Sequence, residues 1–249
     1  MKTLITAFLI SLVFISCQKT VFINNPDAPD HLHNRAVGAS ANELLSSAKY
    51  NSLKIEILYM PGYAPDASAV NHLQSFLSSL LNKPSGISIV TKEIPASSNA
   101  ALSASDVFNI EKANRSAFTT ADQIAVDVIY TNGYYTDNDV LGIAYKNTSV
   151  AIFGKNIHDN SGGIGQASRT KLEATVLEHE IGHLLGLVDL GSAMQTNHKD
   201  AAHGNHCNNN NCLMYYTSNT RDILGILLVG NIPSLDANCR ADLQANGGK

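Results

Sequence analysis

The stretch HEIGHLLG, residues 179–186, decides the fold of this 249-residue chain. Histidines four positions apart on a helix lie on one face, one turn from each other, so both imidazoles can reach one ion. Zinc in a hydrolytic centre needs three protein ligands and an open position for water. A glutamate directly after the first histidine lies beside that water and can act as a general base. His179, Glu180 and His183 meet these requirements, which predicts a zinc-binding helix with hydrolytic chemistry.

Periodic apolar residues around this stretch predict a sheet with helices packed on it. Apolar runs, most of them alternating, predict strands at 54–60, 87–94, 124–130, 140–145 and 149–153. Helical spacing or a capping residue predicts helices at 67–81, 106–118 and 168–187, and the last of these carries the motif. Two closing segments follow at 223–229 and 235–245, the second of them a helix.

The N-terminus has the pattern of an export signal. A short basic start precedes an apolar run at 4–15, which is too short for a good membrane span but typical of a signal-peptide core. The sequence Phe-Ile-Ser-Cys at 14–17 resembles a bacterial lipobox, although Phe14 stands where leucine is usual. We therefore predict a signal peptide over 1–16 and a lipid on Cys17, with plain secretion as the alternative. No second long apolar run follows, so attachment to the membrane is expected through the lipid only.

Residues 17–50 are predicted to form a lipid-anchored linker ahead of a domain at 51–249. The first part of this linker is polar and contains two prolines, so no packed element is expected there. A short helix within 39–49 leads into the domain. His31 and His33 are expected to be solvated, as histidines in an exposed linker usually are.

Downstream of the motif, Cys207, Cys212 and Met214 follow His206 in the pattern His-Cys-x-x-x-x-Cys-x-Met. The motif His-Glu-x-x-His-x-x-Gly, followed by a turn that contains methionine, resembles the metzincin clan of zinc endopeptidases. In that clan the glycine, here Gly186, lets the chain turn toward a third zinc ligand, and the methionine forms an apolar floor under the ion. The segment from His206 to Met214 is similar to that of archaemetzincins, whereas Gly-Leu-x-Asp at 186–189 is similar to snapalysin.

The two resemblances imply different third ligands. Ten residues after His179, the snapalysin count gives Asp189, whereas eight residues before Met214 the archaemetzincin count gives His206. The difference indicates an inserted loop over 188–205. Because imidazole is the commoner zinc partner, we prefer His206, then Asp189. The histidines within the loop are less favoured alternatives, and they are His198 and His203.

The metzincin resemblance implies an α+β fold. It has a mixed, mostly parallel twisted sheet with an antiparallel edge strand, packed by helices, with the active-site helix at 168–187 and the methionine turn at Met214. The segment 149–153 resembles the edge strand along which these enzymes align an extended peptide. Tyr216, two residues after the methionine, corresponds to a tyrosine that reaches the zinc in astacins and serralysins. Alternatively, Tyr216 only packs or lines the cleft.

The remaining cysteines predict one disulfide, because an exported protein lies in an oxidising compartment. The candidates are Cys207, Cys212 and Cys239, with Cys207 and Cys212 paired or Cys239 tied to the methionine turn. Archaemetzincins hold a second, structural zinc with four cysteines. Their late Cys-x-x-Cys is missing here, so we expect one catalytic Zn²⁺ only.

Together these features predict a zinc metalloendopeptidase, exported as a bacterial membrane lipoprotein, in which Glu180 is the general base. Its expected partner is a peptide or protein substrate, and a monomer is expected. The net charge of −4 gives no electrostatic case for nucleic acid. The alternative is a non-catalytic, zinc-binding surface lipoprotein that binds peptide or glycan, although such a site has no use for Glu180.

Overall fold

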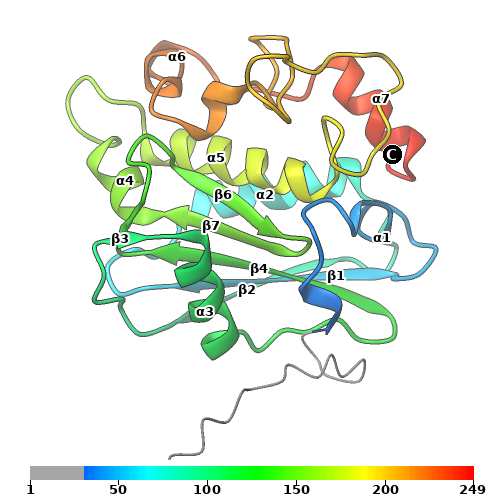
Figure 1. Ribbon diagram of the computed structural model, residues 1–249, viewed down its shortest axis with the longest axis horizontal. Coiled ribbons are helices and arrows are strands. Elements are labelled where there is room, and N and C mark those ends of the chain that lie inside the picture. Colours follow the sequence, from blue (N-terminus) through cyan, green and yellow to red (C-terminus); the bar gives the residue numbers. More distant parts are fainter. Residues whose placement is uncertain (1–30) are drawn as a thin grey trace, which may run out of the picture.

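The computed structural model describes residues 31–249, so the predicted signal peptide and Cys17 lie outside the described residues. A five-stranded sheet has the order β2-β1-β4-β7-β6 (Figure 1). All its neighbouring strands pair in parallel except β6, which runs antiparallel to β7. The predicted mixed, mostly parallel sheet with an antiparallel edge strand is confirmed. The strands are β1 (Ser52–Tyr59), β2 (Ile87–Glu93), β4 (Gln123–Thr131), β6 (Gly142–Lys146) and β7 (Ser149–Phe153).

Helices cover both faces of this sheet, with α2 and α5 on one face and α3 on the other (Figure 1). Two strands of two residues each, β3 (Ala101–Leu102) and β5 (Tyr134–Tyr135), pair beside it. The helices are α1 (Ala41–Leu45), α2 (Ala67–Leu80), α3 (Ala104–Asn114), α4 (Gly154–Asp159), α5 (Arg169–Leu184), α6 (Ile223–Val229) and α7 (Ala237–Ala245), with short 3₁₀ turns η1 (His31–His33) and η2 (Tyr216–Asn219). Within residues 31–249, no helix is long and apolar enough to cross a bilayer.

The antiparallel strand at one edge of the sheet is β6 and not the segment 149–153 that we predicted. We expected residues 149–153 at the edge, but β7 lies between β4 and β6, and all five of its residues are buried. The edge strand is β6, whose last four residues are only half-buried. The physical reason is visible in composition, because a strand buried on both faces is continuously apolar whereas an edge strand carries polar residues such as Lys146.

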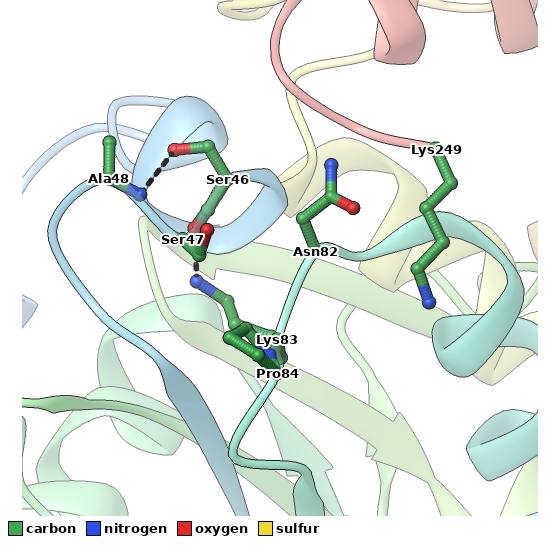
Figure 2. A pocket seen from close by; sticks show the side chains of 7 residues that line it. All are labelled: Ser46, Ser47, Ala48, Asn82, Lys83, Pro84 and Lys249. Carbon is green, nitrogen blue, oxygen red and sulfur yellow. Dashed lines mark hydrogen bonds between the residues drawn. The ribbon is translucent and has the colours of Figure 1, made fainter.

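The second half of the predicted linker is part of the folded domain. Leu44, Leu45 and Tyr50 are buried in the main hydrophobic core. The ammonium group of Lys83 donates to the backbone carbonyls of Glu43, Ser46 and Tyr50, at 2.8, 2.5 and 2.8 Å, and so fixes this segment. Figure 2 shows Lys83 beside Ser46. The segment therefore belongs to the domain because its apolar side chains complete the core.

His33 is likewise buried and not solvated as we expected. Its Nε2 accepts a hydrogen bond from the Thr119 backbone N–H at 3.0 Å, and its Nδ1 lies 2.8 Å from Thr148 Oγ1. Burial and the nearby Arg115 guanidinium lower the pKa of His33 to about 3, so it is a neutral, structural histidine. The linker expectation was wrong here because a polar sequence context does not reveal such long-range partners.

Helix α5 carries the motif and ends at Leu184, three residues before the predicted end at 187. The side chain of Ser168 caps its N-terminus by accepting from the Lys171 backbone N–H. Gly186 follows its C-terminus with φ of 79°, the left-handed conformation that favours glycine. A Cβ at this position would lie 2.5 Å from the backbone nitrogen of Ser192. Gly186 therefore both ends the helix and lets the next loop pack closely against it.

Candidate metal centre and active site

Two histidines of helix α5 and a third from a later loop lie close together. His179 and His183 lie one turn apart on α5, and His206 comes from the following loop. Each offers one ring nitrogen, and these three atoms lie within 4.8 Å of one another. The Nε2 atoms of His179 and His183 are 3.1 Å apart, and Nε2 of His206 is buried without a hydrogen-bond partner. We call His179, His183 and His206 the histidine cluster.

Hydrogen bonds orient two of these rings toward the common point. Nδ1 of His179 donates to the carbonyl of Leu213 at 2.8 Å, and Nδ1 of His206 donates to the carbonyl of His203 at 2.6 Å. Each bond places the ring proton on Nδ1 and leaves the lone pair of Nε2 bare, as in metal-binding histidines. Burial lowers the pKa of His179 to about 3 and that of His183 well below its usual value, so both are neutral.

This geometry fits a zinc ion. Tetrahedral zinc holds imidazole nitrogens at about 2.0–2.1 Å, which places two of them roughly 3.3 Å apart. The observed separation of 3.1 Å between the two helical Nε2 atoms is close to this value. Nε2 of His206, which is buried without a hydrogen-bond partner, is the nitrogen that would complete a set of three ligands for such an ion.

Glu180 lies beside the histidine cluster and is only 1% exposed. Burial raises the pKa of its carboxyl group to about 8, while hydrogen bonds from Asn219 and from the Ala144 backbone oppose the shift. Its Oε1 atom has no hydrogen-bond partner among the described residues. Ala144 belongs to the edge strand β6, so the Glu180 side chain lies against that strand.

Met214 packs directly against helix α5 at Gly182. A Cβ placed on Gly182 would lie 2.4 Å from the Met214 sulfur, so only glycine permits this contact. Met214 is fully buried, and its carbonyl accepts from the Cys207 backbone N–H at 2.8 Å. Met214 therefore lies against the helix that carries His179 and His183, and this contact explains why position 182 of the motif is a glycine.

The structure places the alternative third ligands away from the histidine cluster. The side chain of Asp189 is 60% exposed and pairs with Lys199 at 3.0 Å. His203 stacks on Tyr216 with ring centroids 3.7 Å apart, and His198 lies among the cysteines. His206 is thus the one of the four candidates that the fold brings to His179 and His183.

Tyr216 borders the loop that carries the third histidine. Its ring is stacked nearly parallel to His203, with an interplanar angle of 9°, and the His203 carbonyl holds the ring of His206. The residue begins the turn η2, directly after the methionine segment. Tyr216 therefore packs against the loop that carries His206.

The predicted disulfide is wrong. Cys207, Cys212 and Cys239 are all buried and unbonded, and their sulfurs converge with a carboxylate oxygen of Asp236 to within 4.8 Å. The Cys212 and Cys239 sulfurs are 3.6 Å apart, well beyond a covalent sulfur–sulfur bond of about 2.05 Å. We call the three cysteines the thiol cluster. The sequence analysis considered Cys239 near the methionine turn only as a disulfide partner, and it did not predict that helix α7 brings Cys239 to both other cysteines as free thiols.

A large surface pocket lies elsewhere and has no part in this chemistry. It has a volume of about 570 Å³ (Figure 2). Its walls hold no member of the histidine or thiol cluster, and they are formed by Ser46, Ser47, Ala48, Asn82, Lys83, Pro84 and Lys249.

Comparison with known proteins agrees with the class of site that this geometry defines. Residues 64–224 match metallo-peptidase family M12, which is more than half of the chain. The chain therefore belongs to this family and is a zinc-dependent metallopeptidase. No curated protein matches it. Archaemetzincin from Methanopyrus kandleri is similar in structure, with 15% sequence identity, a TM-score of 0.48, and coverage of 79% of this chain and 96% of that chain.

Proposed function

We propose that the chain is a zinc endopeptidase in which the histidine cluster holds the catalytic ion and Glu180 is the general base. The observation that carries this proposal is the convergence of three histidine nitrogens beside one buried carboxylate. A zinc ion bound there supplies a Lewis acid for the scissile carbonyl and acidifies water. Glu180 takes the proton of the attacking water and passes it to the leaving amine. Tyr216 is proposed to stabilise the oxyanion through its hydroxyl group.

The edge strand β6 is the proposed docking site for the substrate. Among the described residues it pairs with β7 on one side. The backbone of its residue Ala144 hydrogen-bonds to the Glu180 carboxyl group. An extended peptide that added to its free side would therefore run past the general base. Backbone pairing of this kind accepts many sequences, which suits an unstructured peptide or protein substrate.

We also propose that the enzyme is exported and attached to a membrane. A signal peptide at 1–16 and a lipid on Cys17 would make it an exported bacterial membrane lipoprotein, attached by the lipid only. We expect a monomer that does not bind nucleic acid. The non-catalytic alternative, a surface lipoprotein that binds zinc and peptide or glycan, is disfavoured by Glu180, since burying an idle carboxylate costs free energy.

A second ion is part of the proposal and revises the expectation of one zinc per chain. Three buried, unbonded cysteines within ligand distance of one another have the donor set of a structural zinc site. This ion would stabilise the fold and take no part in hydrolysis, since thiolates that enclose an ion leave no open position for water.

Hydrolysis of an internally quenched, unstructured peptide tests the proposed activity. The full chain is assayed as purified, after removal of metal with a chelator, and after addition of zinc. We expect cleavage that disappears with the chelator and returns with zinc. Peptide binding without cleavage in the zinc-loaded protein would support the non-catalytic alternative instead.

A further inference from the structure

The thiol cluster has two candidates for a fourth ligand, Asp236 and His198. We infer that His198, oriented by Asp242, is that ligand, so that the second ion is held by three thiolates and one imidazole. This inference rests on the second ion proposed above and names a residue that we had considered only for the catalytic zinc.

The distances within the group match a tetrahedral site. Nδ1 of His198 lies 3.4 Å from the Cys207 sulfur and 3.9 Å from the Cys239 sulfur, and the Cys212 and Cys239 sulfurs are 3.6 Å apart. Zinc–sulfur bonds of about 2.3 Å and zinc–nitrogen bonds of about 2.0–2.1 Å place two sulfurs roughly 3.7 Å apart, and a sulfur and a nitrogen roughly 3.5 Å apart. Nδ1 of His198 therefore lies close to ligand distance from two of the three sulfurs, those of Cys207 and Cys239.

The other nitrogen of His198 is held by a buried carboxylate. Nε2 lies 2.7 Å from Asp242 Oδ2, and the two side chains are 1% and 0% exposed. The second oxygen of Asp242 accepts from the Gln195 backbone N–H at 2.7 Å, which fixes the carboxylate in turn. A carboxylate that holds one nitrogen of a histidine while the other faces an ion is the usual support of a metal ligand.

Asp236, in contrast, is already engaged. Its Oδ1 accepts from the Cys239 backbone N–H at 2.9 Å and caps helix α7. Its Oδ2 accepts from Asn209 at 2.9 Å and also lies 3.4 Å from the Cys207 sulfur, so this oxygen would have to be shared between an ion and Asn209. The net charge of the site also favours His198 over Asp236. Three thiolates and a carboxylate would leave two negative charges beyond those of the ion in a buried site, whereas three thiolates and an imidazole leave one. His198 is the ligand that costs less to bury.

Three of these four ligands flank His206 in the sequence, and the fourth comes from helix α7. His198 lies in the inserted loop, Cys207 directly follows His206, and Cys212 directly precedes Leu213, whose carbonyl orients His179. Helix α7 contributes Cys239 and Asp242 from the C-terminus. The second ion would thus hold in place the loop that presents the third catalytic histidine.

X-ray absorption at the zinc edge tests this ligand set directly. The zinc-loaded His183→Ala variant is used, because loss of a histidine-cluster ligand leaves the thiol cluster as the main zinc site. We expect about three sulfurs near 2.3 Å and one nitrogen near 2.0–2.1 Å with the outer-shell scattering of an imidazole. Three sulfurs and an oxygen without imidazole scattering would overturn the inference and leave the second ion in place. Zinc without sulfur neighbours would overturn both.

Cobalt substitution and matched variants give a second test. His198→Cys should still bind Co²⁺ tightly, with a stronger thiolate charge-transfer band. His198→Ala should lose most of this band, and Asp242→Asn should lower the affinity by roughly 10- to 100-fold. His158→Ala removes a histidine that stacks on Tyr63 outside both clusters and should match the wild type. A wild-type spectrum and affinity in folded His198→Ala protein would contradict the assignment.

Discussion

The carbonyl oxygen of Leu213 accepts a hydrogen bond of 2.8 Å from Nδ1 of His179. This bond links the methionine segment to the first helical ligand, although the two residues are 34 positions apart. It places the proton on Nδ1 and points the lone pair of Nε2 toward His183 and His206. The segment that carries Met214 therefore orients a ligand as well as packing against helix α5.

Gly182 should not tolerate a side chain, because its Cβ would meet the Met214 sulfur at 2.4 Å. We expect Gly182→Ala to displace Met214, to destabilise the fold by about 1–3 kcal/mol and to weaken zinc binding. Gly225→Ala is the matched control, since a Cβ there meets nothing within 4 Å and alanine favours a helix. Thermal unfolding and zinc content are the measurements. Equal stability of the two variants would show that Met214 can move away from position 182 without loss of folding free energy.

His206 and Asp189 should behave oppositely when they are removed. His206→Ala deletes a ligand, so zinc affinity and peptide hydrolysis should fall together by at least tenfold. Asp189→Ala deletes only an exposed partner of Lys199 and should retain both properties. Zinc titration with a chromophoric chelator and peptide cleavage are the measurements. Loss of catalytic zinc in Asp189→Ala with retention in His206→Ala would reverse our choice of the third ligand.

The stability of the fold should depend on pH through Glu173. Burial raises the pKa of this carboxyl group to about 7 from an ordinary value of 4.5. Because the folded-state pKa is the higher one, the favourable contribution is complete below pH 4.5 and is lost as the pH rises through 7.

Glu173→Gln removes that titration, so the variant should gain stability relative to the wild type between pH 5 and 8, by up to about 3 kcal/mol. Urea unfolding of both proteins across this range is the measurement. A constant difference between them would mean that Glu173 titrates normally in the fold.

Tyr216→Phe separates the two roles of this tyrosine. The phenyl ring keeps the stack on His203, so zinc content should not change. If the hydroxyl stabilises the oxyanion, kcat should fall by about tenfold to a thousandfold. An unchanged kcat in Tyr216→Phe, together with lowered zinc affinity in Tyr216→Ala, would show that the ring acts through packing alone.

Local patterns predicted the parts of this molecule that depend on local physics. Helix α5 and its end at Gly186 follow from helical spacing and from the left-handed residue that terminates a helix. The order of the strands was harder to predict, because the segments 149–153 and 142–146 are both short. Which of them lies at the edge depends on which one pairs with β4, and that pairing is not a local property.

Contacts between distant residues limited the remaining predictions. The third histidine follows an inserted loop, so spacing alone left His206 and Asp189 open. The thiol cluster includes Cys239, and His198 is paired with Asp242; helix α7 brings both Cys239 and Asp242 back from the C-terminus. Buried polar partners such as these depend on the whole fold, and a single sequence does not show them.

Glu180→Gln tests the central claim most directly. Glutamine keeps the size and most of the hydrogen bonding of the side chain but cannot accept the proton of the attacking water. We predict that the variant binds zinc at the histidine cluster as tightly as the wild type, while hydrolysis of the quenched peptide falls by several orders of magnitude. Cleavage at the wild-type rate by zinc-loaded Glu180→Gln protein would contradict the assignment of Glu180 as the general base.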